Sequence, residues 1–187
     1  MSATTPLAID LFAGGGGMAC ALREEGFRAR HVEKDRDACE TLRAAGFDDV
    51  FEGAVERLDE WRPEVAAMLL HGSPPCPVWC SVTHPARREL AYDGWPSMRA
   101  IVEALRTPLV TVENVGESPS VLWEHDLRRM GYHVASWVLD AANYGAPQRR
   151  VRRWIVASLD GPAVFPPPDA RGGALRASSA AHAPRGA

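Results

Sequence analysis

The segment LLHGSPPCPVWCSVTH, residues 69–84, carries a cysteine in a setting where a thiol can react. The segment follows an apolar stretch, and its prolines fix φ and remove amide donors, which predicts a stiff loop at the end of a strand. A thiol held there is exposed enough to react, whereas a cysteine in a helical pattern, such as Cys39, is usually a small core residue. Cys76 is therefore the candidate nucleophile. Cys76 and Cys80 form a single C-x-x-x-C pair without a second pair of metal ligands, so we expect no metal site.

A carboxylate and an amide end a second apolar stretch, VTVENV, at residues 110–115. Glu113 accepts hydrogen bonds and Asn114 both donates and accepts them, so the pair can bind the polar edge of a planar heterocycle. If this stretch is a strand of the same sheet, Glu113 shares a cleft with Cys76. The alternative from these residues alone is that Glu113 only caps the turn that follows.

Four consecutive glycines join an apolar stretch to a helical one in DLFAGGGGMACAL, residues 10–22. Such a turn lets the backbone approach a cofactor closely and leaves the amides of the helix start free. Glu33 ends the next apolar stretch, where a carboxylate can accept hydrogen bonds from both hydroxyls of a ribose. S-adenosylmethionine and a nicotinamide or flavin dinucleotide fit this segment equally well, because Gly14, Gly16 and Ala19 also satisfy the pattern G-x-G-x-x-A.

The elements that must position these residues follow an alternating order. Apolar runs and amphipathic stretches alternate over residues 1–160, which predicts one α/β domain with a mostly parallel sheet and helices on both faces. The expected strands are residues 7–12, 29–33, 50–52, 65–71, 109–113, 134–139 and 153–157. Two helices are expected to bury apolar faces, one made of Ala38, Cys39, Leu42 and Ala45, the other of Val121, Leu122, His125, Leu127 and Met130.

The composition bounds the partners and the location. Residues 161–187 are rich in Pro, Gly, Ala and Ser without a hydrophobic period, which predicts a disordered tail. The net charge of −3 argues against binding nucleic acid over the whole surface, so any such contact must be local. The candidate patch is QRRVRR, residues 148–153, although a solvated strand end is the alternative. Neither a secretory signal nor a membrane span is present, so we expect a cytoplasmic protein without membrane contact.

These segments together carry a resemblance. DLFAGGGG, Glu33, SPPC, ENV and YGAPQRRVRR occur in the order found in the cytosine-C5 DNA methyltransferase family, which the chain resembles over residues 7–158. The resemblance displaces the dinucleotide alternative and implies a Rossmann-like methyltransferase fold with S-adenosylmethionine as the cofactor. It implies that Glu33 binds the ribose and that Asn114 lies beside the catalytic glutamate. The residues that match the methionine-contacting loop are Phe12, Ala13, Gly14, Gly16 and Gly17.

The resemblance also implies a reaction, the methylation of C5 of a cytosine in DNA. Cys76 would attack C6 of the base, while Glu113 hydrogen-bonds N3 and the exocyclic amine. Arg150 and Arg152 would support the base and the thiol, with Arg152 on the base carbonyl. A cytosine in a duplex would have to flip out of the stack to reach this site.

Three departures from the family pattern qualify these expectations. Ala54 stands where the family places an aspartate that accepts from the adenine amine, so either Glu52, Glu56 or a backbone carbonyl replaces it, or adenine is held less selectively and cofactor affinity falls. Pro77 stands in the place of a glutamine beside the nucleophile. The target-recognition region and two further segments do not follow the arginine segment. We therefore expect either a second subunit that supplies target recognition or an enzyme of low selectivity. The alternatives are a non-catalytic binding or regulatory subunit, and cytosine methylation in RNA.

Overall fold

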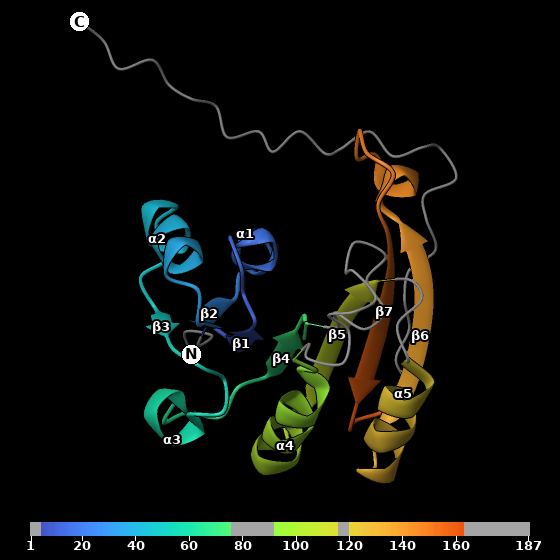
Figure 1. Cartoon of the computed structure of the whole chain (residues 1–187). Coiled ribbons are helices and arrows are strands. Elements are labelled where there is room, and N and C mark those ends of the chain that lie inside the picture. The colour runs from blue at the N-terminus through green and yellow to red at the C-terminus, as the bar shows by residue number, and fades with distance from the viewer. Residues whose placement is uncertain (1–4, 76–91, 116–119, 163–187) are drawn as a thin grey trace, which may run out of the picture.

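A seven-stranded sheet organises the chain in a computed structural model that describes residues 5–75, 92–115 and 120–162 (Figure 1). The order across the sheet is β3-β2-β1-β4-β5-β7-β6, and β7 is antiparallel to both of its neighbours, whereas the other pairs are parallel. The predicted α/β class with a mostly parallel sheet is therefore confirmed. The strands are β1 (Leu7–Leu11), β2 (Arg28–Glu33), β3 (Val50–Glu52), β4 (Leu69–Gly72), β5 (Leu109–Val115), β6 (His133–Asp140) and β7 (Val151–Ser158).

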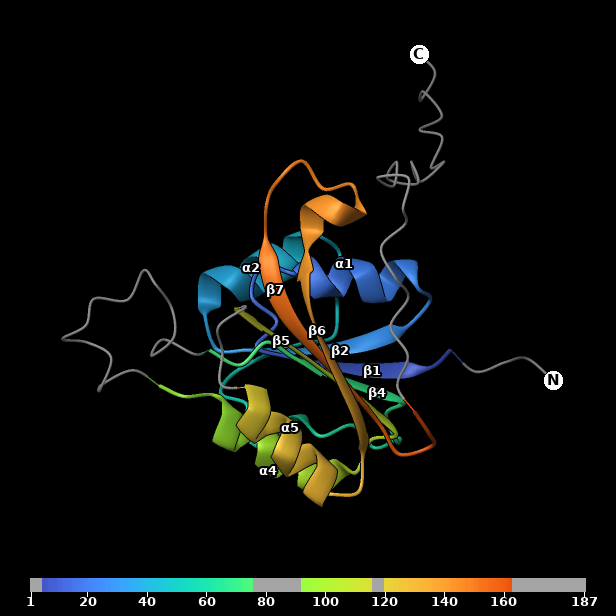
Figure 2. The ribbon, with the colours of Figure 1, turned by 90° about the vertical axis from the view of Figure 1, so that its right-hand side faces the viewer.

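Helices cover both faces of the sheet, as Figure 2 shows in a view along its edge. On one face lie α1 (Gly17–Glu24) and α2 (Arg36–Ala44), and on the other lie α4 (Trp95–Leu105) and α5 (Ser120–Arg129). Two short elements, α3 (Leu58–Trp61) and the 3-10 helix η3 (Ala141–Tyr144), complete the described chain. None of the helices in the described ranges is long and apolar enough to cross a membrane.

The core lies between β1, β4 and β5 and the pair α4 and α5. Every residue of β1 is buried, as expected for a central parallel strand that is covered on both faces. On the face of α4 and α5, the indole rings of Trp95 and Trp123 stack with centroids 5.0 Å apart. Such a pair contributes about 0.5–1.5 kcal/mol beyond the area it buries. It joins α4 to α5, so the two helices act as one support for the central strands.

Each predicted helical face is partly confirmed; in α2 the prediction holds for Cys39 and Leu42, whereas Ala38 is half-buried and Ala45 is exposed beyond the end of the helix. Cys39 and Leu42 are fully buried, and the Asp35 carboxylate caps α2 by accepting from the Ala38 amide. In α5, by contrast, Val121 and Leu122 are 74% and 66% exposed. Leu127 is buried as predicted, and the other buried position is Trp123, one helical turn before it; the exposed side chain of His125 also lies outside this face. The bulk of Trp123, which fills the space beside Trp95, sets the rotation of the helix.

Two further differences concern the start of β4 and the helix α4. The strand expected at residues 65–71 begins only at Leu69, and Val65 and Met68 are more than half exposed. Its neighbours set this limit, because the first pairings of β4 are Leu69 with Ala8, the second residue of β1, and with Leu109, the first residue of β5. The helix α4 was not predicted. The expected tail lies, from residue 163 onward, outside the described residues.

Candidate functional site

The glycine turn follows β1 at the carboxyl edge of the parallel strands, and it has an unusual backbone. Phe12, Gly14 and Gly16 all have positive φ, at 57°, 53° and 96°. Gly16 caps α1 and lies so close to α2 that a Cβ atom there would stand 2.9 Å from Leu42. A side chain is thus excluded at Gly16 by both backbone and packing, and Phe12 stores backbone strain at the edge of the site.

Glu33, at the end of β2, faces this turn with a fixed carboxylate. Its Oε2 accepts from the Gly14 amide at 2.8 Å, and its Oε1 accepts from the Lys34 and Asp35 amides at 2.8 and 2.9 Å. Three backbone donors therefore hold the carboxylate in one orientation. Oε1 already accepts two hydrogen bonds, but Oε2 accepts one and can take another from a ribose hydroxyl.

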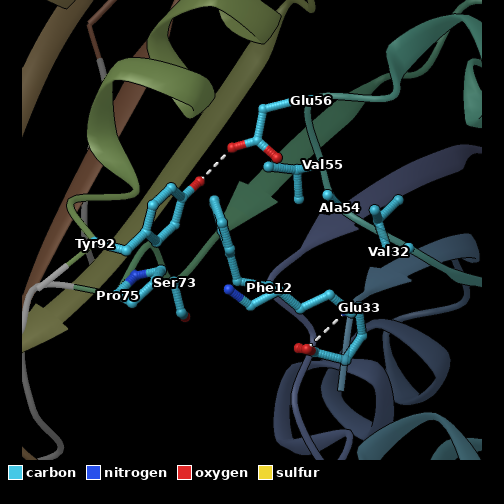
Figure 3. A pocket seen from close by; sticks show the side chains of 11 residues that line it. Phe12, Val32, Glu33, Ala54, Val55, Glu56, Ser73, Pro75 and Tyr92 are labelled. Atoms are coloured by element: carbon cyan, nitrogen blue, oxygen red, sulfur yellow. Dashed lines mark hydrogen bonds between the residues drawn. The ribbon is translucent and has the colours of Figure 1, made fainter. Parts of the chain in front are cut away.

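A first cavity of about 320 Å³ opens beside Glu33 (Figure 3). Its walls are mostly apolar, and it has a carboxylate on each of two opposite sides, from Glu33 and from Glu56. Ala54 lines it as well, whereas the carboxylate of Glu52 is paired with Arg43 at 2.8 Å. The lining residues are Phe12, Val32, Glu33, Lys34, Gly53, Ala54, Val55, Glu56, Ser73, Pro75 and Tyr92.

A second cavity of about 440 Å³ lies against the first, because Phe12 and Ser73 line both. Ala13 and Gly17 of the glycine turn form part of its wall, and Glu113 and Arg150 form another part. A ligand in the first cavity and a ligand beside Glu113 would therefore meet near Phe12 and Ser73. Such an arrangement suits the transfer of a group from one bound molecule to another.

Glu113 is paired with the two arginines that the sequence assigned to the same site. Arg152 Nε lies 3.0 Å and Arg150 Nη2 lies 3.7 Å from Glu113 Oε1, and the Glu113 side chain is 15% exposed. Both contacts use the same oxygen, so Oε2 remains available to a ligand. The pairing follows from the register of β5 and β7, in which Glu113 lies opposite Trp154 and Val115 opposite Arg152.

Asn114 does not line the first cavity; its amide instead holds the segment that leads to Cys76. The buried Nδ2 donates to the Pro74 carbonyl at 2.7 Å, and Oδ1 accepts from the Val115 amide at 2.8 Å. The end of β5 thereby fixes the residues after β4 at a point two positions before the candidate nucleophile. Cys76 itself lies outside the described residues, as do Pro77 and Cys80.

A row of polar residues, three of them buried, crosses the sheet, and two of its members line the second cavity; this row was not predicted from the sequence. Asp10 lies between His31 and His71 in the register, and Thr111 lies on the far side of His71. Asp10 Oδ2 accepts from His31 Nδ1 at 3.0 Å, while His71 contacts Thr111 Oγ1 at 2.9 Å. Polar residues at equal depth in adjacent apolar stretches are the signal that could have revealed this row.

His71 is neutral at neutral pH in this setting. Burial lowers its pKa below the ordinary value, and the opposing effect of the Asp10 carboxylate is smaller. Its Nε2 lies 3.2 Å from Ser73 Oγ, so a neutral imidazole positions the hydroxyl that borders both cavities. The nearby pair of Asp10 and His31 is also almost fully buried.

Asp140 is a second residue without an assigned role that orders the arginine segment. Its carboxylate accepts from the Ala142 and Arg150 amides, at 3.2 and 2.9 Å, and from Arg149 Nε at 3.2 Å. These hydrogen bonds, above all those from the two backbone amides, lower the pKa of Asp140. The turn between β6 and β7 is fixed by this residue, so Arg150 is presented to Glu113 from an ordered backbone.

Comparisons with known proteins agree with the fold and identify a family. The model of the family described as C-5 cytosine-specific DNA methylase matches residues 7–169. The chain is 30% identical to the type II methyltransferase M.PspPI of Psychrobacter sp., over 79% of the chain and 38% of that protein. It is 24% identical to the type II methylase M.HgiDII of Herpetosiphon aurantiacus, over 86% of the chain and 49% of that protein. The chain thus spans less than half the length of these two curated relatives.

A solved structure shares the fold at low sequence identity. The crystal structure of the S. pombe Dnmt2 methyltransferase superposes with a TM-score of 0.69 and 18% identity, over 86% of this chain and 53% of that one. The methyl donor of the matched family is S-adenosylmethionine, which confirms the predicted cofactor over the dinucleotide alternative. The first cavity fits its adenosine half, because Glu33 offers an oriented acceptor and the walls around Phe12 and Val55 are apolar. The departure from the family pattern that lies in this cavity is Ala54, where the family has an aspartate.

Proposed function

The chain belongs to the C-5 cytosine-specific DNA methylase family, and we propose that it transfers a methyl group from S-adenosylmethionine to C5 of a cytosine in DNA. The observation that carries the proposal is the position of Glu113, Arg150 and Arg152. Glu113 and Arg150 line a cavity that shares Phe12 and Ser73 with the cavity beside Glu33, and Arg152 pairs with Glu113 from the adjoining hollow. Substrate and cofactor would thus occupy adjoining spaces.

In the proposed reaction the thiolate of Cys76 adds to C6 of the cytosine and forms a C–S bond. S-adenosylmethionine, when bound, supplies an electrophilic methyl group for C5. N3 takes up a proton as the thiolate adds, and Glu113 accepts hydrogen bonds from the protonated N3 and from the exocyclic amine through the carboxylate that the arginines orient. Loss of the C5 proton and β-elimination of the sulfur then release 5-methylcytosine and restore Cys76, so that one difficult substitution becomes several easier steps.

The arginines act in this scheme by orientation and charge. Arg152 holds Glu113 in place and offers its remaining donors to the carbonyl of the base, and Arg150 adds positive charge beside the same carboxylate. A guanidinium close to the thiol also favours the thiolate form. Asn114, through the Pro74 carbonyl, positions the segment before Cys76 rather than contacting the cofactor.

A duplex that contains 5-fluorocytosine tests this mechanism. Fluorine cannot leave C5 as a cation, so the wild-type protein with cofactor should form a covalent complex that persists in denaturant. No complex should form with Cys76→Ala. A wild-type protein that forms none, or a Cys76→Ala protein that does, contradicts the covalent mechanism. Cofactor binding without any methyl transfer would instead favour the binding or regulatory subunit.

We also propose that a second polypeptide supplies target recognition and docks where β6 ends and β7 begins. Val138 and Val151 are 49% and 40% exposed there, on the face of the two strands opposite to the hollow that Leu139, Arg152 and Trp154 line. Apolar surface of this kind is typical of sites that bind another protein. A Val151→Asp protein should lose co-purification with a partner encoded nearby, while its cofactor affinity stays unchanged. Methylation by the isolated chain at wild-type specificity contradicts the need for such a partner.

A further inference from the structure

Glu56 places a carboxylate at the end of the first cavity that lies opposite Glu33 (Figure 3). Two hydroxyls hold it there, those of Tyr92 and Ser97, and Ser97 Oγ donates at 2.6 Å. Both hydrogen bonds go to Oε1, and the two hydroxyls also lie 3.0 Å from one another. The carboxylate is therefore fixed, with Oε2 available to a ligand in the cavity.

The charge of Glu56 is also fixed. Burial alone would raise its pKa, but the hydrogen bonds from Ser97, from Tyr92 and from its own backbone amide, together with the ammonium group of Lys34, outweigh burial and lower it. Lys34 Nζ lies 4.8 Å from the centre of the Tyr92 ring, so it stays near this group. An ionised carboxylate only accepts hydrogen bonds, and the ligand atom it binds must be a donor.

The other replacements considered for the missing aspartate are weaker. Ala54 lines the cavity but has no polar side chain. Glu52 does not line the cavity: its Oε2 accepts from Arg43 Nη1 at 2.8 Å and its side chain is 40% exposed. Of the carboxylates near position 54, Glu56 is the one that lines the cavity.

We propose that Glu56 accepts a hydrogen bond from the exocyclic amine of the adenine ring and so takes the role that Ala54 cannot fill. The inference rests on the proposed binding of S-adenosylmethionine in the first cavity. Adenosine has ribose donors at one end and an amine donor at the other, and the cavity has Glu33 and Glu56 at corresponding ends. The apolar side chains of Phe12 and Val55 lie between them, as a flat ring requires. Tyr92 and Ser97 are positioning residues.

Calorimetric titration with two ligands tests this role without any turnover. S-adenosylhomocysteine carries the 6-amino group, and S-inosylhomocysteine carries a 6-oxo group that a carboxylate repels. The wild-type protein should prefer the amino ligand by about tenfold or more, since a site built around one hydrogen bond rejects a ligand that lacks the donor. Glu56→Gln should lose most of that preference, because an amide can also donate to the 6-oxo group.

Three variants separate this role from indirect effects. Glu52→Gln, the matched control, should keep the wild-type preference. Glu56→Ala should bind the amino ligand about five- to tenfold more weakly, and Tyr92→Phe should show a smaller loss of the same kind. Circular dichroism melting establishes that each variant is folded.

Two outcomes would overturn the inference, and they differ in reach. If Glu56→Gln keeps the wild-type preference for the 6-amino ligand, a backbone carbonyl near position 54 reads the adenine, and Glu56 only orients Tyr92. If the wild-type protein binds neither ligand, the cofactor site of the proposed function fails together with the inference.

Discussion

The hydrogen bond from Asn114 to the Pro74 carbonyl predicts that one substitution in β5 impairs a nucleophile on a different segment. Asn114→Ala removes the donor and leaves the carbonyl of a buried residue without its partner. An unsatisfied buried group of this kind costs about 1–3 kcal/mol of folding free energy. At about 2 kcal/mol, a chain of this size should melt roughly 4–8 °C lower than wild type.

The effect on the reaction should exceed the effect on cofactor binding. Pro74 lies two positions before Cys76, and a displacement of about 1 Å in a reacting group can cost about 100-fold in rate. The rate of covalent trapping by fluorocytosine DNA should therefore fall by about that factor. The Kd of S-adenosylhomocysteine should change by less than about threefold, because Asn114 does not line the first cavity.

Differential scanning calorimetry and the trapping assay measure the two effects, and Asn143→Ala is the matched control. Asn143 is an exposed asparagine in η3, so its removal should leave both the melting temperature and the trapping rate at wild-type values. If Asn114→Ala behaves like Asn143→Ala in both assays, the hydrogen bond does not position the segment before Cys76. A large loss of cofactor affinity in Asn114→Ala would instead support the role beside the cofactor that the resemblance implied.

Three further predictions test the surroundings of the site. Because burial lowers the pKa of His71, below about pH 6.5 the unfolded chain binds a proton that the folded chain does not. The free energy of unfolding therefore decreases as the pH is lowered, by up to about 1.4 kcal/mol per pH unit. Urea unfolding between pH 5 and 7.5 should show that slope reduced in His71→Asn, and equal slopes would contradict it. Gly16→Ala should lower the free energy of unfolding by about 1–3 kcal/mol, because Gly16 has a φ of 96° and its Cβ would contact Leu42. Gly17→Ala is the control, since a Cβ there meets open space, and it should cost less than about 0.5 kcal/mol. Similar urea midpoints for the two variants would refute the packing argument. Glu33→Ala should weaken S-adenosylhomocysteine binding by about tenfold or more, and an unchanged calorimetric Kd would remove Glu33 from the site.

The order of elements could be predicted because each strand is a distinct apolar run, but two helices show where local patterns fail. In α4 the sequence WPSMRAIVEAL begins with Trp95 and Pro96, and a proline that usually breaks a helix is favourable in the first turn. In α5 the exposed Val121 and Leu122 imitate a buried face. The true face is decided by Trp95, a residue of another helix, and no local period contains that information.

The site residues fall into the same two groups: some could be predicted from sequence motifs, and others depend on contacts between distant segments. Glu33 and Glu113 could be found from the ends of apolar stretches, because parallel strands bring their carboxyl ends to one edge. The role of Asn114 could not, because Pro74 is 40 residues away in sequence. Glu56 depends in the same way on Ser97, 41 residues distant. Such pairs become neighbours only through the order of the strands and the position of α4.

The spacing of the two arginines follows from the strand that begins between them. Alternate residues of an extended chain share a face, so Arg150, directly before β7, and Arg152 and Trp154 within it lie on one side, and all three line the hollow beside Glu113. The antiparallel register places Trp154 opposite Glu113 and Arg152 opposite Val115, so Arg152 reaches Glu113 diagonally. A shift of one residue would turn the other face of β7 toward Glu113 and remove both guanidinium groups from it. The single residue between the two arginines is therefore a requirement of β geometry, and the pairing with Glu113 depends on the antiparallel arrangement of β7 and β5.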